Sequence, residues 1–380
     1  MQKRPKRSTV ILLAVAAVVV IGVGVGGVLL KQNWNKPLGE GLGMPTLAPT
    51  ETLIIPTAAP TSEIDSLALG GTPEATVTAE PTLTPTPEPL CGGPATMMLL
   101  GIGADNRSDN YLYGLSDVMR IARVDFVTPK VTMLSIPRDL WVEIPDIADH
   151  YGIDHGKLNQ AYLYGGPGMG YYDGPGGGPG LLARTLDLNF GLRVEHYGAV
   201  NMQTFVKIID AVGGIDVYLE RDVDGRPVDE KTDDMGYFTA GQHHLSGAEA
   251  LRLSRIRKKY SDLARGDNQT LVLCALKEKV TSAAVLPKIP QIIAAFEGSV
   301  QTDLTPAQIS QLACLVPKLS RENLIFTSLP KDILKPGTVY DPYMKDNTFV
   351  FDVDFDEIRS YVDQFVAGAW PTQPEEPSCP

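Results

Sequence analysis

An uncharged, apolar stretch of 22 residues, from Thr9 to Leu30, constrains this chain more than any other feature. As a helix it spans about 33 Å, which is enough to cross the hydrocarbon core of a bilayer. A cleaved signal peptide is the alternative, but its apolar core is typically about 7–15 residues long and ends in a small-residue cleavage site. Four glycines end this stretch without such a site. We therefore predict an uncleaved transmembrane anchor at residues 9–30.

The distribution of charge predicts the orientation of this anchor. Residues 1–8 form a basic tail with four Lys and Arg, whereas only Lys31 and Lys36 follow the apolar stretch closely. The positive-inside rule places the basic tail in the cytoplasm and the rest of the chain outside the cell. The chain has a net charge of −12, and its first 36 residues contain no acid. Nucleic acid requires a basic surface, so we do not expect this acidic exterior part to bind it.

Residues 37–89 are rich in proline and threonine, carry scattered acids and contain no aromatic residue. Such a composition cannot form a packed core. We predict an extracellular linker over residues 31–95, whose Pro/Thr-rich part spans roughly 40 Å as a flexible chain and lifts the folded region off the membrane. The folded region is predicted to consist of a core over residues 96–282, a further part of the same domain over 283–370 and a tail over 371–380.

Four cysteines, at positions 91, 274, 314 and 379, are an even number, which suits disulfide bonds outside the cell. No C-x-x-C spacing indicates a zinc site. Because Cys91 and Cys379 bracket the folded region, we expect one bridge between them and a second between Cys274 and Cys314. The sequence leaves the other two pairings open.

Three short apolar runs open the folded region, at residues 96–102, 118–127 and 131–136. Their composition and alternation are typical of β-strands, and the short links between them favour an antiparallel meander. Further along the chain, helical and strand patterns alternate, with helices expected near residues 181–188, over 202–212 and from 271 onward. We predict an α/β fold: a layered α-β-α domain with a central mixed, largely antiparallel sheet.

In such a meander, the end of the first strand, the start of the second and the end of the third share one edge of the sheet. Polar residues stand at all three points: Asp105, Arg107, Asp117, Arg138 and Asp139. Crowded carboxylates raise each other's pKa unless cations neutralise them. Arginines supply part of that charge, and Mg²⁺, which takes one or two carboxylates plus phosphate oxygens, suits the rest. The alternative is that these are ordinary loop residues.

A stretch from Gly247 to Gln269 concentrates basic residues in this acidic chain. Read as a strand, it points Arg255 and Arg257 to one face, whereas a helix would splay them apart. Paired guanidiniums fit phosphate oxygens, with each charge-assisted bond contributing about 1.5–3 kcal/mol. A helix beside Arg265 places Arg265 and Gln269 on one face, near an N-terminus that favours anions. A solvated basic surface is the alternative.

A Gly-rich segment from Tyr164 to Gly180 lacks the strand and helix context of a nucleotide-binding loop. We expect it to be a mobile surface loop.

Seven segments, in order along the chain, resemble the LytR-CpsA-Psr (LCP) family of cell-envelope phosphotransferases. They are LLGIGADNR, LSDVMRIARVD, VTMLSIPRDLWVEIP, KLNQAYLYGG, FVKIIDAVGGIDVYL, GQHHLSGAEALRLSRIR and DLARGDNQ. The likeness covers about Thr96 to Ser282, and more loosely extends to Val366. Members of this family are known for carrying a glycan from an undecaprenyl-pyrophosphate-type lipid to peptidoglycan through a phosphodiester.

The resemblance implies roles by matching position. It assigns Asp105 and Asp117 to Mg²⁺. It assigns pyrophosphate binding to Arg107, Arg138, Arg255, Arg257 and Arg265, and catalysis to Arg138, Asp139, Arg255 and Arg257. We add Gln269 to the pyrophosphate-binding residues because it shares a helix face with Arg265. Asp139 is a candidate base. Leu115 and Asn268 stand where the family usually has arginines.

Residues and resemblance together predict a Mg²⁺-assisted phosphotransferase with its catalytic domain outside the cell. It would move a glycopolymer from a polyprenyl-pyrophosphate-linked donor to peptidoglycan or another cell-wall acceptor. The resemblance also implies an apolar groove between sheet and helices for the polyprenyl tail. Two alternatives remain: a pyrophosphatase that acts on the same lipid, and a non-catalytic envelope protein that binds polyprenyl phosphate.

Overall fold

The computed structural model describes residues 34–44, 88–106, 111–150, 152–230, 232–256, 262–285 and 298–372, with residues 288, 292, 296 and 379. The predicted anchor at residues 9–30 lies outside these ranges, as do Arg107 and Arg257. None of the helices within them is both long and apolar enough to cross a membrane. Residues 34–44 and those from 89 onward belong to one compact unit.

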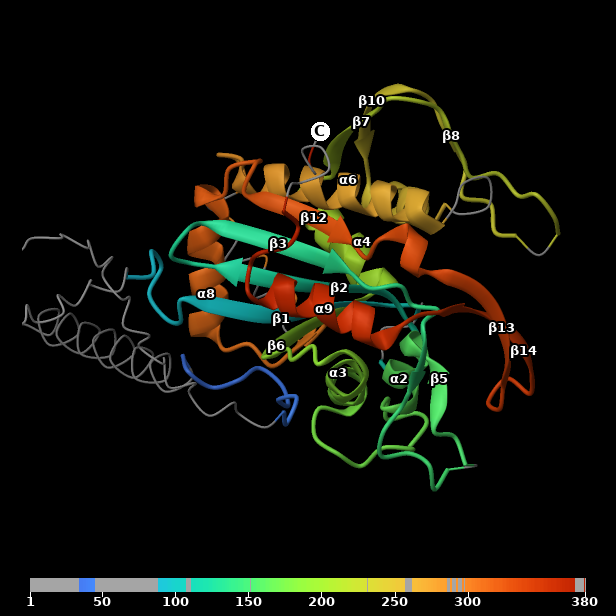
Figure 1. The fold of residues 1–380 in the computed structure, drawn as a ribbon. Helices are drawn as coiled ribbons and strands as arrows, with labels where there is room; N and C mark the ends of the chain where they lie inside the picture. The colour runs from blue at the N-terminus through green and yellow to red at the C-terminus, as the bar shows by residue number, and fades with distance from the viewer. Residues whose placement is uncertain are drawn as a thin grey trace, which may run out of the picture. The chain divides into compact units, whose positions relative to one another are not determined.

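A six-stranded mixed sheet lies at the centre of this unit (Figure 1). Its strand order is β11-β6-β1-β2-β3-β12. The strands are β1 (Thr96–Ala104), β2 (Ser116–Asp125), β3 (Lys130–Ser135), β6 (His196–Asn201), β11 (Gln301–Thr302) and β12 (Leu324–Ser328). β1, β2 and β3 form the predicted antiparallel meander, while β6 and β12 run parallel to β1 and β3. The prediction of an α/β fold with a central mixed sheet is confirmed.

The alternation along the strands gives each face of the sheet its own apolar core. On one face, Leu100, Ile102 and Ile121 are fully buried under α2 (Leu158–Tyr164), α3 (Gly177–Phe190) and α9 (Phe355–Val366). On the other face, Met97 and Val124 pack in a cluster with side chains from α6 (Asp262–Thr281) and α8 (Pro306–Leu315). Helices therefore cover both faces, with α6 along the upper side of the sheet in Figure 1.

A third apolar cluster joins α6 to the elements beside it. These are α4 (Met202–Ala211), α5 (Gly247–Arg255) and the antiparallel pair β7 (Ile215–Leu219) and β10 (Gly241–Leu245). Asn201 caps α4 by accepting a hydrogen bond from the Thr204 amide at 2.8 Å. This cap begins α4 directly at the end of β6, so the helix starts at the edge of the sheet where the polar residues gather.

Three two-stranded pairs complete the described part of the fold, and the sequence patterns did not predict them. They are β4 (Trp141–Glu143) with β5 (His155–Lys157), β8 (Val223–Asp224) with β9 (Tyr237–Phe238), and β13 (Lys335–Asp341) with β14 (Asp346–Asp352). Short 3₁₀ helices occupy Val316–Lys318 and Lys331–Ile333.

The end of the Gly-rich segment is helical rather than a loop. α3 begins at Gly177, directly after Gly176, whose φ of 77° is the left-handed conformation that glycine adopts freely. A Cβ on Gly180 would lie 2.0 Å from the carbonyl oxygen of Pro175. The helix is therefore built around glycines because the preceding turn packs directly on its backbone.

The disulfide pairing expected from the sequence is wrong. The bonds join Cys91 to Cys314 and Cys274 to Cys379, with Cα atoms 5.9 and 5.5 Å apart. Cys314 lies on α8, whose residue Gln311 donates a hydrogen bond to the carbonyl of Pro94 near the start of β1. Cys91 and Cys379 bracket the folded region in sequence, but each reaches a different helix, so position along the chain misassigned the partners.

Residues 34–44, which fall within the predicted linker, pack on the folded unit; we call them the docked segment. Leu42 is 3% exposed and belongs to the core beneath α3. The Leu38 amide donates to the carbonyl of Leu304 at 3.2 Å, and the Tyr197 hydroxyl donates to the carbonyl of Glu40 at 3.2 Å. This part of the predicted linker therefore belongs to the folded unit.

Candidate functional site

A cavity of about 620 Å³ lies between one face of the central sheet and helices α4, α5 and α6. Its apolar lining comes from β2, β6 and all three helices: Val118, Val200, Met202, Phe205, Leu251, Val272 and Leu273. Glycines at positions 101, 103 and 198 also line it from β1 and β6. A Cβ on Gly198 would meet no atom within 4 Å, so the sheet leaves open space there. We call this space the sheet cavity.

Five residues predicted for the site line the sheet cavity: Asp105, Asp117, Arg138, Arg255 and Gln269. The meander explains the meeting of the first three, because the ends of β1, β2 and β3 share one edge. The amides of Asp105 and Asp117 both donate to the carbonyl of Leu115, at 2.8 and 3.0 Å. The backbones of the two aspartates are thereby joined through a single carbonyl oxygen. They lie where this edge of the sheet borders the sheet cavity, which we call the rim.

The guanidinium of Arg138 lies between two carboxylates. Its Nη1 is 2.5 Å from Oδ1 of Asp117, and its Nε is 3.2 Å from Oδ2 of Asp139. Asn159, from the first turn of α2, donates to the same Asp117 oxygen at 3.3 Å. The side chains of Arg138 and Asp117 are each 18% exposed, so water screens this ion pair only in part. Arg138 is held in a fixed direction at the rim.

Asp139 is not among the residues that line the sheet cavity. It is 8% exposed, and its Oδ1 accepts from Nζ of Lys157 at 3.0 Å while its Oδ2 accepts from Arg138. Two cations therefore contact this carboxylate. The geometry favours a role in orienting Arg138 over proton transfer to a substrate.

Arg255 is the last residue of α5, so the strand interpretation of this stretch is wrong at Ser254 and Arg255. A capping box at Ser246 and Glu249 begins the helix, and this S-x-x-E pattern is the sequence signal that identifies it. The guanidinium of Arg255 lies 3.7 Å from the carboxylate of Asp233. Helix geometry places Arg255 at the C-terminal end of α5, on the wall of the sheet cavity.

α6 supports the end of α5. Asn268 and Gln269 donate from their side-chain amides to the carbonyls of Leu253 and Ser254, both at 3.4 Å. α6 begins at Asp262, so Arg265 lies within its first turn rather than before it, and only the backbone of Arg265 is described. The roles of Arg107, Arg257 and Arg265 stay predictions from sequence.

The donor set at the rim can be compared with the needs of Mg²⁺. In the ranges that the structure describes, no group of three or more His, Cys, Asp or Glu residues is arranged to hold a metal ion. Asp105 and Asp117 offer two carboxylates beside several guanidiniums. Mg²⁺ commonly takes one or two carboxylates and completes its shell with water and substrate phosphate oxygens. These residues therefore fit Mg²⁺ together with a phosphate ligand.

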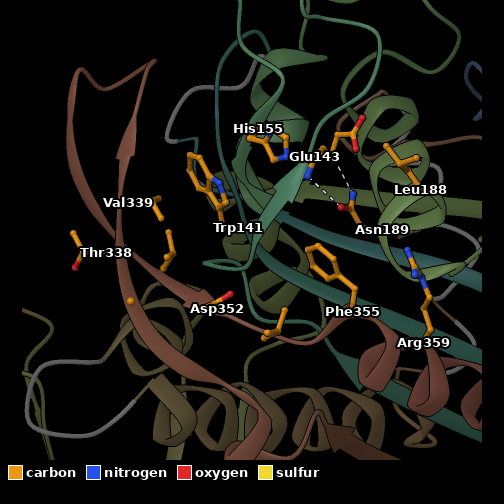
Figure 2. Close-up of a pocket in the computed structure, with 13 residues that line it drawn as sticks. Trp141, Glu143, His155, Leu188, Asn189, Thr338, Val339, Asp352, Phe355 and Arg359 are labelled. Atoms are coloured by element: carbon orange, nitrogen blue, oxygen red, sulfur yellow. Dashed lines mark hydrogen bonds between the residues drawn. The ribbon is translucent and has the colours of Figure 1, made fainter.

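A second cavity, of about 660 Å³, lies between the two hairpins β4–β5 and β13–β14 and the helices α3 and α9 (Figure 2). Its lining includes Trp141 and Phe355 with the polar residues Glu143, His155, Asn189, Asp352 and Arg359. Asn189 joins α3 to β4, since its side chain bonds both the amide and the carbonyl of Glu143, at 3.1 and 2.7 Å. No residue predicted for the site lines this cavity.

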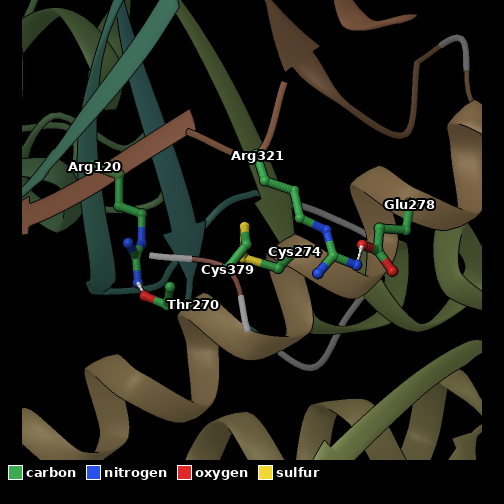
Figure 3. Close-up of a disulfide and its surroundings, with 6 residues drawn as sticks. All are labelled: Arg120, Thr270, Cys274, Glu278, Arg321 and Cys379. Carbon is green, nitrogen blue, oxygen red and sulfur yellow. Dashed lines mark hydrogen bonds and ion pairs between the residues drawn. A yellow bond between two sulfur atoms is a disulfide. The ribbon is translucent and has the colours of Figure 1, made fainter. Parts of the chain in front are cut away.

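The sequence patterns missed four charged residues of the sheet cavity, namely Asp224, Arg226, Asp233 and Arg120. Of these, Arg120 on β2 is the most buried. Met119 and Ile121 face the core under α2 and α3, so Arg120 projects toward α6 with Val118. It is 7% exposed, and its Nη2 donates to Thr270 at 3.2 Å (Figure 3). The same Nη2 also donates to the carbonyl of Gly266 at 3.4 Å. Burial lowers the pKa of Arg120 to about 10. The sequence did contain a signal for it: Arg120 occupies a position of the alternating strand whose side chain faces the protein interior.

Comparisons with known proteins agree with the resemblance seen in the sequence. The profile of the LytR_cpsA_psr family matches residues 74–364. "Polyisoprenyl-teichoic acid–peptidoglycan teichoic acid transferase TagU" of Oceanobacillus iheyensis is 36% identical over 217 residues, which are 56% of this chain and 61% of that protein. "Regulatory protein MsrR" of Staphylococcus aureus is 28% identical over 217 residues, 56% of this chain and 58% of that protein. The match therefore spans about three fifths of the length of these curated relatives.

The solved structures agree in fold. The crystal structure of TagV from B. subtilis superposes with a TM-score of 0.53 at 26% sequence identity and covers 72% of this chain and 97% of that chain. The family profile covers well over half of the sequence. The chain belongs to the LytR-CpsA-Psr family.

Proposed function

We propose that this protein transfers a glycopolymer from a polyprenyl-pyrophosphate-linked donor to a cell-wall acceptor, peptidoglycan, through a phosphodiester bond. One observation carries the proposal: the lining of the sheet cavity combines an apolar interior with the charged side chains of Asp105, Asp117, Arg138 and Arg255. A ligand with an apolar tail and a compact anion matches that division. The printed name of the TagU relative, a polyisoprenyl-teichoic acid–peptidoglycan transferase, supports the same class of reaction.

The apolar interior suits part of a polyprenyl tail. Side chains from α4, α5 and α6 line it, and the bare backbone at Gly198 leaves room against the sheet. Each Å² of apolar surface that the tail buries contributes about 25 cal/mol to binding. The rim then receives the pyrophosphate, where charge-assisted bonds from arginines are about twice as strong as neutral ones.

The proposed reaction is an in-line displacement at the glycan-side phosphorus. A hydroxyl oxygen of the acceptor forms a new P–O bond, the bond to the bridging oxygen breaks, and polyprenyl phosphate leaves with the electron pair. The hydroxyl proton passes to water or a carboxylate at the rim. Arg138 and Arg255 stabilise the negative charge that grows on the phosphate oxygens. When bound to Asp105 and Asp117, Mg²⁺ supplies further neutralisation of that charge.

Asp139 has a supporting part in this proposal. Because Arg138 and Lys157 already occupy both of its oxygens, it keeps Arg138 pointed along the rim rather than accepting a proton. A fixed guanidinium contributes more than a mobile one, since it needs no reorganisation as charge develops.

The test uses full-length protein in detergent micelles, a farnesyl-pyrophosphate-linked saccharide, peptidoglycan fragments, and buffers with Mg²⁺ or EDTA. We expect mass spectrometry to find the saccharide joined to peptidoglycan by a phosphodiester. Arg138→Met should reduce the rate about 10- to 150-fold, corresponding to one lost charge-assisted bond. The matched control is Arg123→Met. Arg123 lies on the face of β2 that points away from the sheet cavity, where it pairs with Asp125 and donates to the carbonyl of Val366.

Two results would contradict the proposal. Release of the saccharide phosphate to water at the same rate with and without peptidoglycan would identify a pyrophosphatase. Donor binding without any turnover, in wild type and with Mg²⁺, would identify a binding protein.

A further inference from the structure

Arg120 carries a buried positive charge that lacks a negatively charged partner among the described residues. Its side chain is in contact with a neutral carbonyl, a neutral hydroxyl and the ring of Phe326, whose centroid is 5.4 Å from the guanidinium carbon. Within the part of the chain that the structure describes, its buried Nε has no hydrogen-bond partner. The two nearest carboxylates on β2 are engaged elsewhere: Asp117 pairs with Arg138 and Asp125 pairs with Arg123.

Such an arrangement lowers the stability of the fold when no ligand is bound. Moving a cation out of water costs several kcal/mol unless an anion or a full set of acceptors replaces the water. A buried donor without an acceptor adds about 1–3 kcal/mol. A methionine at position 120 would fill a similar volume without either cost. The presence of an arginine therefore indicates that an acceptor arrives from outside the chain.

The position of Arg120 limits what that acceptor is. The residue lines the sheet cavity, three positions along β2 from Asp117 at the rim. It reaches α6 between Gly266 and Thr270, beside Gln269, which lines the same cavity. A group that meets Arg120 must therefore lie inside the cavity and not on the outer surface.

We propose that Arg120 binds a phosphate oxygen of the polyprenyl-linked ligand, on the lipid side of the pyrophosphate. The proposal rests on the function proposed above and adds a residue to the same cavity. Arg138 and Arg255 at the rim contact the glycan-side phosphate, while Arg120, further inside, contacts the phosphate that stays with the lipid. After transfer, the product keeps that phosphate, so Arg120 holds the departing polyprenyl phosphate as well as the donor.

The competing explanation is structural: Arg120 joins β2 to α6 and to Phe326 on β12. The two explanations differ in what Arg120→Met does to ligand binding. If Arg120 binds phosphate, the variant loses affinity for phosphorylated prenyl ligands and keeps its affinity for the uncharged alcohol. If it is structural, affinity for all prenyl ligands changes together or not at all.

The experiment measures binding of farnesyl phosphate, farnesyl pyrophosphate and farnesol to full-length protein in detergent, by isothermal titration calorimetry. We expect Arg120→Met to weaken the binding of both phosphorylated ligands by about 10- to 150-fold, as for one lost charge-assisted bond, and to leave the binding of farnesol unchanged. Arg120→Lys keeps the charge and should recover part of the affinity. Arg123→Met, on the other face of β2, should bind like wild type. Arg138→Met should weaken farnesyl pyrophosphate more than farnesyl phosphate.

Thermal unfolding without ligand separates folding from binding. Arg120→Met should unfold at or above the wild-type temperature, because the substitution removes a buried, unpaired charge. Equal binding of farnesyl phosphate by wild type and Arg120→Met would overturn this inference and leave the proposed function standing. Failure of wild type to bind either phosphorylated ligand would overturn both. If Arg120→Met does not fold, Arg120→Lys decides: the inference fails if its affinities for farnesyl phosphate and farnesol fall in equal measure.

Discussion

The ion pair between Arg138 and Asp117 sets up a competition that can be measured. Nη1 of Arg138 lies 2.5 Å from an oxygen of Asp117, so a phosphate must share or displace that carboxylate. Asp117→Asn removes the negative charge and leaves a bond from the guanidinium to a neutral amide oxygen, which we expect to weaken a contact of about 1.5–3 kcal/mol by about 1–1.5 kcal/mol. A phosphate that displaces residue 117 from Arg138 then has to overcome about 1–1.5 kcal/mol less, and its binding free energy improves by that amount. Without Mg²⁺, we therefore expect the variant to bind farnesyl pyrophosphate about five- to tenfold more tightly than wild type.

With Mg²⁺ the sign reverses. Asp117 is then proposed to hold the cation, and its loss should weaken binding and lower turnover. Calorimetry of wild type and Asp117→Asn in EDTA and in Mg²⁺ gives the four affinities. Asp125→Asn is the matched control, since Asp125 lies on the same strand and pairs with Arg123. Unchanged or weaker binding by Asp117→Asn in EDTA would refute the competition, and an identical response to Mg²⁺ in both proteins would refute Asp117 as a metal ligand.

Three further predictions concern stability, each measured as the free energy of unfolding in urea without reductant. Replacing Cys274 and Cys379 by alanine removes the bond that closes a loop of 105 residues; the loop-entropy relation gives about 4.8 kcal/mol, and we expect a loss of roughly 2–5 kcal/mol. Leu42→Ala should cost about 2–5 kcal/mol because Leu42 is 3% exposed in the core, whereas a Gly/Ser segment of equal length in place of residues 46–87 should change stability by less than about 0.5 kcal/mol. Burial raises the pKa of Tyr197 to about 12, so stability that is complete below pH 10 should be lost as the pH rises toward 12, by about 2–3 kcal/mol, and Tyr197→Phe should show a shallower loss.

A specific result would contradict each of these three stability predictions. An unchanged free energy in the double cysteine variant would mean that the bond does not restrain the unfolded chain. An unchanged free energy of unfolding in Leu42→Ala would mean that the docked segment is not part of the folded unit in solution. Equal pH profiles for wild type and Tyr197→Phe would mean that other tyrosines account for the alkaline loss.

Local patterns predicted the central meander and the meeting of Asp105, Asp117 and Arg138. Short links leave consecutive strands little choice but to pair, and the shared edge follows from that topology. The helix that ends at Arg255 also had a local signal, the capping box at Ser246. The alternating arginines suggested a strand instead.

Other features depend on contacts between distant parts of the chain. The partners of Cys91 and Cys379 depend on where α8 and α6 pack, which no spacing reveals. The glycines at the start of α3 oppose a helix by propensity, and tertiary packing overrides that preference. A Cβ on Gly178, for example, would lie 2.7 Å from the carbonyl oxygen of Tyr162. Arg120 was hidden for a similar reason, since its burial follows from the position of α6.

The docked segment changes the expected height of the protein above the bilayer. The Pro/Thr-rich stretch both leaves and rejoins the same folded unit, so its length does not set that height. With Thr9–Leu30 as the proposed anchor, residues 31–33 alone intervene before Trp34, and three extended residues reach about 10–11 Å. The proposed transferase would then act close to the membrane surface, within reach of a lipid carrier's headgroup, and the acceptor polymer would have to approach the membrane.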